Sequence, residues 1–350
     1  MGVGFGVDVH VPGFQSEGWD VAALFSRDPQ KGRRAADASG VPDVHTDPYE
    51  LIGRDDIDAV AIATPPAPHH DYAVAALRAG KHVLCEKPFA IDARQASGMR
   101  SVAEETGRTA MVAHEFRHTP QRALIKRLLS DGYIGEFKVC NIELFMGRAV
   151  SSTPRPVTWA ARKSEGGGFL GALGSHYIDG LRDWFGDIHS VTGHLATLRP
   201  DMVDPVTGAP ATSETDDTFS FVLTFKNGGF ATMTASFATV PSRGARIAVM
   251  GSGGTLYAEQ AGPNPAQDGS VMGSQGERPV APLVTPPELT PFTDSRDPRL
   301  MAFRLLVRDF TRRIDEGTSP APNFTDGLKC QEVLDAVRLS AAEGRTVNLD

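Results

Sequence analysis

The chain has 350 residues, of which 41% are hydrophobic and 22% charged, and its formal net charge is −8. This length predicts about two domains, and the negative charge argues against nucleic acid or an anionic membrane as a partner. No apolar run long enough to span a membrane and no cationic leader is seen, so we expect a cytoplasmic protein. The three cysteines, Cys85, Cys140 and Cys330, lack metal-ligand spacing and are expected to be reduced, buried thiols.

The first stretch of the chain, MGVGFGVDVH, is rich in glycine. Gly2 and Gly4, followed by Phe5, fit the start of a dinucleotide-binding turn of the form Gly-x-Gly-x-x-Gly, with Gly6 one place early for the third glycine. Glycine-rich starts are also typical of disordered termini, but an apolar stretch, VAALF, follows at the spacing of a second strand. We therefore predict a phosphate-binding turn. Such a turn normally follows a buried strand, of which only Met1 is present, so we expect a truncated first strand and a natural start upstream.

Up to about residue 120, short apolar stretches alternate with helical ones. Apolar runs without alternation are typical of strands buried on both faces of a parallel sheet. We predict strands within 19–26, 58–66, 81–88 and 109–116, and helices over 28–40, 69–80 and 92–107, which end at Gly40, Gly80 and Gly107. This order predicts a doubly wound α/β Rossmann domain over residues 1–120.

After Pro120 the pattern changes to alternating strands. We predict a helix over 121–136, a hairpin over 217–237 that turns at Asn227-Gly228, and a second hairpin over 245–259. The Pro-, Gly- and Ser-rich residues 260–298 are predicted to form a long mobile loop, and two helices close the chain over 297–317 and 325–344. Residues 121–350 are therefore predicted to form an α+β domain with a mainly antiparallel sheet, whose closing helices are able to pack on the first domain.

The end of the second predicted strand indicates which nicotinamide cofactor is bound. An acidic residue at this position would bind the adenosine ribose and repel a 2′-phosphate. The chain has Ser26 and Arg27 instead, and a hydroxyl and a guanidinium suit a phosphate. We predict NADP(H) as the cofactor, with NAD as the alternative.

Three further stretches resemble the Gfo/Idh/MocA oxidoreductases, named for glucose–fructose oxidoreductase and inositol dehydrogenase. The first, ATPPAPHHDYAVAALRAGKHVLCEKPFA, spans residues 63–90, and the others are AHEFRHTP and GGGFLGALGSHYIDGLRDWFG. The closing helix is similar as well, so the resemblance covers nearly the whole chain. The matching residues are Thr64, Pro65, His69, Gly80, Lys81, His82, Glu86, Lys87, Pro88, Arg117, Pro120, Gly174, His176 and Asp179.

The resemblance implies hydride transfer between NAD(P) and a secondary alcohol or carbonyl. It places the nicotinamide over the strand ends that carry Thr64, Glu86 and Lys87, with Pro65 and His69 in the same cofactor site. Oxidation of an alcohol requires a base for the hydroxyl proton, and the reverse reaction requires an acid. We assign this proton to Lys87, and His176 is expected to share it or to bind the substrate hydroxyl. Outside this context both residues would be read as structural.

The sequence departs from the family pattern at Ala172. Many members have an aspartate at this position, four residues before the histidine, which completes a Lys–Asp–His set; an alanine cannot orient His176. Glu115 and His118 are alternative polar groups, equally able to cap a turn. Arg117 and Trp159 are expected to contribute to substrate binding, although packing is an alternative role for Trp159.

Our sequence-based prediction is an NADP-preferring oxidoreductase acting on a sugar, cyclitol or other polyol. Two alternatives stay open: an enzyme for a non-sugar cyclic diol or ketone, and a catalytically idle NADP-binding sensor. We expect no metal, because His69 and His70 are adjacent without further ligands, and a homodimer or homotetramer. The cleft that selects the substrate is expected to be shaped by the loop after Met146 and by residues 155–163.

Overall fold

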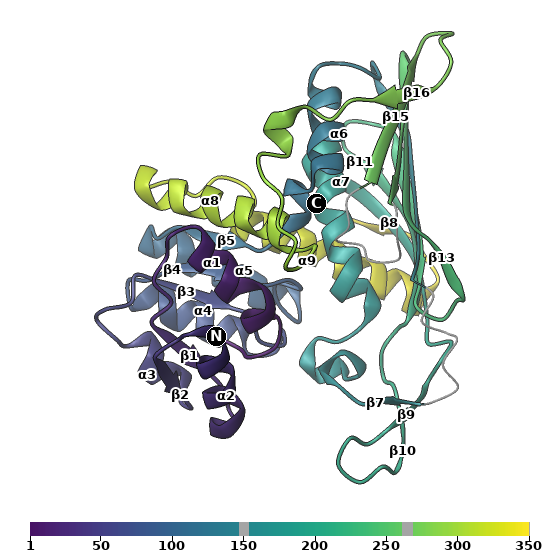
Figure 1. Ribbon diagram of the computed structural model, residues 1–350. Helices are drawn as coiled ribbons and strands as arrows, with labels where there is room; N and C mark the ends of the chain where they lie inside the picture. The colour runs from purple at the N-terminus through teal and green to yellow at the C-terminus, as the bar shows by residue number, and fades with distance from the viewer. Residues whose placement is uncertain (147–153, 261–268, 350) are drawn as a thin grey trace. The chain divides into compact units, whose positions relative to one another are not determined.

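The computed structural model describes residues 1–146, 154–260 and 269–349 (Figure 1). The chain folds into two compact units. Unit 1 comprises Met1–Glu115 and Asp294–Gln331, and unit 2 comprises Phe116–Thr293 and Glu332–Asp350. Residues 294–331 belong to unit 1 although they are far from residues 1–115 in sequence, whereas the sequence predicts a single division of the chain at residue 120.

Unit 1 is built on parallel strands with helices on both faces, as predicted. One face packs on α4 and α5 through apolar residues that include Ile62, Val83 and Met99. The other face packs on the first helices and α8 through Leu84, Met111 and Phe303 among others. The strands are β1 (Ala23–Phe25), β2 (Asp43–His45), β3 (Ala59–Ile62), β4 (His82–Cys85) and β5 (Ala110–Val112). The helices are η1 (Gly6–His10), α1 (Val11–Ser16), α2 (Pro29–Ser39), α3 (Pro48–Ile52), α4 (His69–Arg78), α5 (Ala93–Thr106) and α8 (Leu300–Glu316).

The parallel strands of unit 1 fall into two groups, β1–β2 and β3–β4–β5. Met1 and Gly2 lie between the groups and connect them. The Met1 amino group donates to the Ala61 carbonyl at 2.5 Å, and the Ala63 N–H donates to the Met1 carbonyl at 2.8 Å. On the other side, the Gly2 N–H donates to the Phe25 carbonyl at 3.1 Å. These two residues therefore make the bonds of a parallel strand toward both neighbours at the position where the sequence predicts a shortened strand.

Polar caps begin several of the helices of unit 1. The side chain of Asp28 accepts a hydrogen bond from the Lys31 N–H at the start of α2, and Asp92 does the same for Gln95 at the start of α5. Both helices end at a left-handed glycine, Gly40 and Gly107, as the sequence predicts. The strand ends that precede these helices carry the candidate cofactor residues.

Unit 2 contains a large mixed sheet, with nine strands among the described residues in the order β16-β15-β14-β13-β6-β12-β11-β8-β17 (Figure 1). Only the β12–β6 pair in this sheet is parallel among the strands that the structure describes. The Asn227-Gly228 hairpin is confirmed, with Thr218 opposite Ser236. The strands are β6 (Phe137–Met146), β8 (Ile188–Ala196), β11 (Thr218–Phe225), β12 (Phe230–Ser236), β13 (Pro241–Gly251), β14 (Gly254–Gln260), β15 (Gly269–Gln275), β16 (Ala281–Leu283) and β17 (Val347–Asn348).

Helices α6 (Pro120–Ser130) and α7 (Ser175–Phe185) lie on one face of this sheet (Figure 1). The ring of Phe185 in α7 stacks on Phe137 of β6, with centroids 3.8 Å apart. The last long helix, α9 (Phe324–Glu343), begins in unit 1 and ends in unit 2. Helix η2 (Glu115–His118) starts at the boundary between the two units. The smaller elements of unit 2 are the strands β7 (Arg155–Pro156), β9 (Asp201–Val203) and β10 (Pro210–Thr212) and the short helices η3 (Trp159–Ala161), η4 (Lys163–Glu165), η5 (Leu170–Gly174) and η6 (Pro287–Leu289).

The prediction of one long loop over residues 260–298 is wrong. Residues 269–275 form β15, which pairs antiparallel with β14, and β16 pairs with β15 in turn. Val271 of β15 is buried. Residues 269–275 therefore form a strand because they pair with β14, although their composition is typical of a loop. Two segments lie outside the described residues, 147–153 and 261–268. The first is the loop after Met146, which the sequence predicts to help shape the substrate cleft.

The cysteine prediction is confirmed, because Cys85, Cys140 and Cys330 are all free and buried. Burial raises the pKa of the Cys140 thiol far above its ordinary value. Across the residues that the structure describes, no helix is both long and apolar enough to cross a membrane.

Candidate cofactor and catalytic site

The glycine turn of unit 1 leaves its backbone open to a ligand. A Cβ atom built on Gly4 would meet no atom within 4 Å. Gly2, in contrast, adopts a φ of +106°, and a Cβ there would lie 2.5 Å from the Ala63 carbonyl oxygen. The Val7 and Asp8 N–H groups both donate to the Gly4 carbonyl, at 2.9 and 3.1 Å, and so start the helix. A tight turn with open space over its second glycine fits the close approach of a pyrophosphate.

Phe5 and Gly6 contribute to this turn in different ways. The Phe5 ring packs against the apolar cluster beneath the sheet and lies 5.1 Å from the Arg299 guanidinium carbon. Its backbone, rather than its side chain, is therefore the part of Phe5 that suits the cofactor. Gly6 begins η1, and a Cβ there would make ordinary contact with Ala63 at 3.4 Å.

Ser26 and Arg27 follow β1 directly, as predicted, and differ in environment. The Ser26 hydroxyl is buried and donates to the Asp28 carbonyl at 2.8 Å, so it shapes the turn before α2. The Arg27 side chain is exposed. Of the two, Arg27 is the group with the freedom to reach a 2′-phosphate, and Ser26 has a structural task in addition to any contact with the cofactor.

At the end of β3, Thr64 and His69 form a connected group. The Thr64 hydroxyl is buried and has no hydrogen-bond partner among the described residues. The Nε2 atom of His69 lies 2.9 Å from the Thr64 carbonyl oxygen, and its Nδ1 lies 3.2 Å from that of Phe89. Burial lowers the pKa of His69, although these carbonyls oppose the shift. His69 thus ties the loop of Thr64 and Pro65 to the segment after Lys87, and the unpartnered Thr64 hydroxyl is a group that a cofactor would satisfy.

Glu86 and Lys87 follow β4. The buried Glu86 carboxylate accepts a hydrogen bond from the His10 ring at 2.9 Å through Oε1 and from the Lys87 N–H at 3.2 Å through Oε2. Lys87 itself is half-buried. Since the ends of β1, β3 and β4 lie at the same edge of parallel strands, the structure brings Arg27, Thr64 and Lys87 to the edge where open α/β sheets bind nucleotides.

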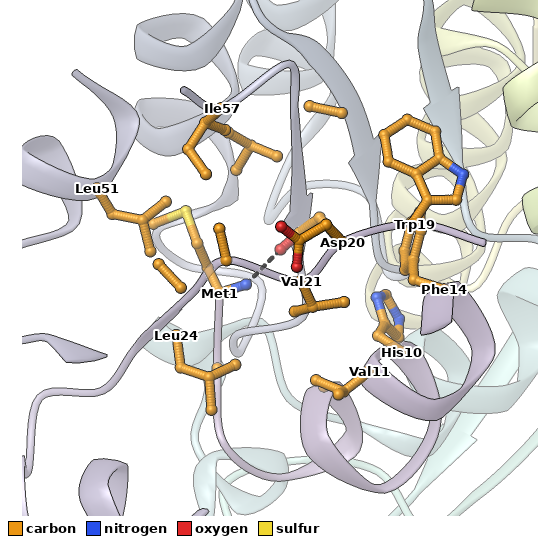
Figure 2. Close-up of a pocket in the computed structure, with 17 residues that line it drawn as sticks. Met1, His10, Val11, Phe14, Trp19, Asp20, Val21, Leu24, Leu51 and Ile57 are labelled. Carbon is orange, nitrogen blue, oxygen red and sulfur yellow. Dashed lines mark hydrogen bonds between the residues drawn. The ribbon is translucent and has the colours of Figure 1, made fainter. Parts of the chain in front are cut away.

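An apolar cavity of about 90 Å³ lies beside this site, between β1 and β3 (Figure 2). Met1, Val21, Leu24, Leu51 and Ile57 line it with His10 and other residues. The cavity borders the position at which Met1 begins to pair with β3.

In unit 2, His176 lies in the first turn of α7 and is buried. Its ring stacks on Phe116, with centroids 3.8 Å apart and planes 10° apart. The Arg122 guanidinium carbon lies 4.2 Å from the centroid of the same Phe116 ring. Because both groups are so close to one centroid, they occupy opposite faces of the ring, which fixes the plane of the imidazole.

Arg117, a predicted substrate residue, is held by two carboxylates of α7. Its Nε and Nη2 each donate to Asp179 at 2.7 Å, and Nη1 donates to Asp183 at 2.9 Å. The side chains of Arg117 and Asp179 are 10% and 1% exposed, so this is a buried, bidentate ion pair. The geometry shows a structural role for Arg117, whereas a role in substrate binding stays a prediction.

The remaining predicted residues lie on short elements. Glu115 is buried at the start of η2, which also carries His118 at its end. Trp159 begins η3 and is partly buried. Ala172 lies in η5, one helical turn before His176. In the described parts of the chain no group of three or more His, Cys, Asp or Glu side chains could hold a metal ion.

Two residues at these sites were not singled out from the sequence. His10 contacts Glu86 across 76 positions of sequence, and Phe116 contacts His176 across 60. His10 occurs in the glycine-rich opening stretch, where a polar side chain among apolar helical neighbours was a usable signal. For Phe116, the only signal in the sequence is its position shortly after a predicted strand.

The architecture of unit 1 is that of a Rossmann-type, dinucleotide-binding domain, and sequence comparison identifies the family. Residues 1–114 match the family model described as "Oxidoreductase family, NAD-binding Rossmann fold", and residues 126–349 match the model of its C-terminal alpha/beta domain. The chain belongs to the Gfo/Idh/MocA family of NAD(P)-dependent oxidoreductases.

Individual relatives are similar over most of their length. Levoglucosan dehydrogenase of Pseudarthrobacter phenanthrenivorans is 28% identical and covers 92% of this chain and 87% of its own. D-xylose 1-dehydrogenase (NADP(+)) 2 of Haloferax volcanii is 27% identical over 99% of this chain and 97% of its own. The crystal structure of an oxidoreductase domain protein from Kribbella flavida has a TM-score of 0.89 at 27% identity, covering 99% of this chain and 96% of the other.

Proposed function

We propose that this chain is an NADP-preferring dehydrogenase or reductase that acts on a secondary alcohol or carbonyl of a sugar, cyclitol or related polyol. The observation that carries the proposal is Lys87, placed after β4 beside the buried Glu86 in a chain of this family. The dehydrogenase names of the relatives, for levoglucosan and D-xylose, support the substrate class.

The nicotinamide, when bound, donates or accepts the hydride. The residues of the chain handle the proton and the orientation of the substrate. In the oxidising direction the Nζ atom of Lys87 takes the hydroxyl proton, and in the reducing direction it returns one to the developing alkoxide. His176, held flat by Phe116, binds a substrate hydroxyl or shares this proton. The cofactor would be held by the backbone of the turn at Gly2, Gly4, Phe5 and Gly6 and by Ser26, Arg27, Thr64, Pro65, His69 and Glu86.

Cofactor choice is tested by fluorescence titration with NADPH and, separately, NADH. Since a charged hydrogen bond contributes about 1.5–3 kcal/mol, we expect Arg27→Ala to weaken NADPH binding roughly 10- to 100-fold and to change NADH binding little. Arg34→Ala removes an exposed arginine of the following helix and serves as the matched control. A wild-type preference for NADH would contradict the role of Arg27 in phosphate binding.

Catalysis is tested by Lys87→Ala in a screen of sugars and cyclitols with both nucleotides. The variant should lose turnover and keep nucleotide binding, whereas Lys226→Ala, which removes an exposed lysine of the β11–β12 turn, should behave as the wild type. Unchanged turnover in Lys87→Ala would contradict the assignment of the proton to this residue.

One specific observation favours a second function. By the resemblance described in the sequence analysis, Ala172 stands where many family members carry an aspartate, and an NADP-binding sensor without turnover is the alternative. Saturable NADPH binding with no turnover of any polyol, in wild type and Lys87→Ala alike, would support the sensor. For assembly we propose a homodimer or homotetramer, which sedimentation equilibrium of the full chain tests.

A further inference from the structure

His10 and Glu86 form a hydrogen-bonded pair inside unit 1. His10 ends η1, the first helical element after the glycine turn, and Glu86 follows β4. Their Nε2 and Oε1 atoms are 2.9 Å apart, and the two residues are only 3% and 5% exposed. We propose that His10 is a positioning residue for Lys87: it holds the Glu86 carboxylate, which in turn holds the Lys87 peptide group. This inference rests on the proposed function for the role of Lys87.

The direction of the hydrogen bond follows from the environment of the pair. Burial lowers the pKa of His10, although Glu86 opposes the shift, so the imidazole is neutral. Burial alone would raise the pKa of Glu86, but the hydrogen bond from His10, the charge of Lys87 and the hydrogen bond from the Lys87 N–H bring it below its ordinary value, so the carboxylate is ionised. A neutral imidazole has one N–H, and an ionised carboxylate can only accept. The Nε2 atom of His10 is therefore the donor, and its Nδ1, buried without a partner among the described residues, is the unprotonated nitrogen.

Aromatic side chains hold the His10 ring in this direction. The Phe303 ring from α8 lies 4.4 Å from the imidazole centroid at an interplanar angle of 35°. Phe5, from the glycine turn, meets the imidazole edge-on at 5.6 Å. Since Phe5 precedes η1 and Phe303 belongs to a helix far along the chain, the donor is fixed by packing from two sides. A rotation of the ring would disturb both contacts.

The held carboxylate reaches Lys87 through its second oxygen. Oε2 of Glu86 accepts the Lys87 N–H at 3.2 Å, and the Glu86 N–H donates to the Ile62 carbonyl at 2.9 Å. The Glu86 side chain thus holds the peptide group between Glu86 and Lys87, and β3 holds the preceding peptide group, between Cys85 and Glu86. If His10 releases Oε1, the carboxylate is free to rotate, and the starting point of the Lys87 side chain is no longer defined.

Two substitutions separate positioning from packing. His10→Met has similar length and no N–H donor, whereas His10→Gln places an amide N–H close to the position of Nε2. The matched control is His82→Met, which removes a partly buried imidazole at the start of β4, whose Nδ1 accepts the Thr109 N–H. Each variant is compared with the wild type as full-length protein, and thermal unfolding is followed for all of them.

The first readout does not depend on activity. Selective ¹⁵N-lysine labelling of the nucleotide-free protein reports amide exchange at Lys87. We expect exchange at least tenfold faster in His10→Met, a value nearer the wild type in His10→Gln, and no change in His82→Met. Equal exchange in wild type and His10→Met would overturn the inference, whether or not the protein turns over a polyol.

The second readout is the division between kcat and KM. For a polyol that the wild type oxidises, His10→Met should lower kcat about tenfold or more while KM and the NADPH Kd change less than about threefold, and His10→Gln should recover most of kcat. Equal losses in His10→Met and His10→Gln, together with equal losses of thermal stability, would show a packing role and overturn the inference. A wild type that binds no nucleotide would contradict the proposed function instead, and the lysine exchange would still decide the role of His10.

Discussion

The ring of Phe116 lies parallel to the imidazole of His176, with centroids 3.8 Å apart and planes 10° apart. Arg122 covers the other face of the phenyl ring at 4.2 Å. The imidazole plane is thus set by a stack of three side chains that belong to η2, α6 and α7, all within unit 2. The plane of the imidazole is therefore fixed by packing in a chain that has an alanine at position 172.

Phe116→Leu should therefore lower turnover more than it lowers stability. Leucine keeps much of the buried volume, so we expect a loss of about 1–1.5 kcal/mol in the free energy of unfolding, measured by urea denaturation. The flat surface under His176 is lost, so kcat should fall about tenfold with a smaller change in KM. The control is Phe225→Leu, because Phe225 is equally buried and packs on Phe185 at the far end of α7. Equal losses of kcat in both variants would contradict this prediction.

Arg117→Met should destabilise unit 2 strongly. The substitution leaves the carboxylate of Asp179, which is 1% exposed, without its bidentate partner. Removing one member of a buried pair costs about 3–5 kcal/mol. Arg117→Lys should recover only part of this loss, since an ammonium cannot donate in the bidentate geometry. Arg33→Met, which breaks the exposed Arg33–Asp37 pair, should change stability by less than about 1 kcal/mol.

If Arg117 acts in substrate binding as well, Arg117→Lys should raise KM beyond what its stability explains. Thermal unfolding and Michaelis kinetics on the same preparations measure both effects. A stable Arg117→Met variant would contradict the structural role assigned to the ion pair.

The protein should lose stability as the pH falls from 8 to 5. Burial lowers the pKa of the Met1 amino group to about 5, so over this range the unfolded chain takes up a proton that the folded chain does not. The free energy of unfolding then decreases with falling pH, on the order of 3 kcal/mol across the window. Burial also lowers the pKa of His69. At a pH below the ordinary pKa of histidine, this group therefore reduces the free energy of unfolding as well. Urea denaturation at pH 8, 7, 6 and 5, on protein whose intact mass shows that Met1 is retained, measures the effect; a constant free energy would contradict it.

Filling the cavity between β1 and β3 should stabilise unit 1. The Met1 amino group already bonds to Ala61 and the Gly2 N–H to Phe25, so residues placed ahead of Met1 in an extended conformation would continue both ladders. Four Val and Ile residues inserted there should raise the free energy of unfolding by roughly 1–3 kcal/mol, because their burial outweighs the loss of chain entropy. The variant should also lose the part of the pH dependence that belongs to the Met1 amine. A Gly-Ser insertion of equal length is the control, and equal stability of the two would contradict this prediction.

Much of this protein can be read from the sequence, because the relevant signals are local. The positions of glycines in the sequence predict the turn at Gly2 and Gly4 and the helix ends at Gly40 and Gly107. In the structure, Gly2, Gly40 and Gly107 have a positive φ, and Gly4 has open space beside it. Apolar runs mark β3 and β4, and Asn227-Gly228 marks the hairpin of β11 and β12. Parallel strands bring their carboxyl ends to one edge, so Arg27, Thr64 and Lys87 could be placed at that edge without a structure, whereas their role in cofactor binding stays a prediction.

Other features depend on contacts between distant segments, and only the tertiary structure decided them. Nothing near His10 in sequence shows that it faces Glu86, 76 residues away, because that contact depends on how η1 packs beside β4. The order of β15 comes from pairing with β14, which local composition does not report. Arg117 is a conspicuous cation in the sequence, but its two carboxylate partners on α7 give it a structural role through geometry and burial. Local sequence patterns therefore predict the helices and strands, and sequence motifs predict the class of chemistry. Which buried polar side chains are fixed in place depends on packing between segments that are far apart in the sequence.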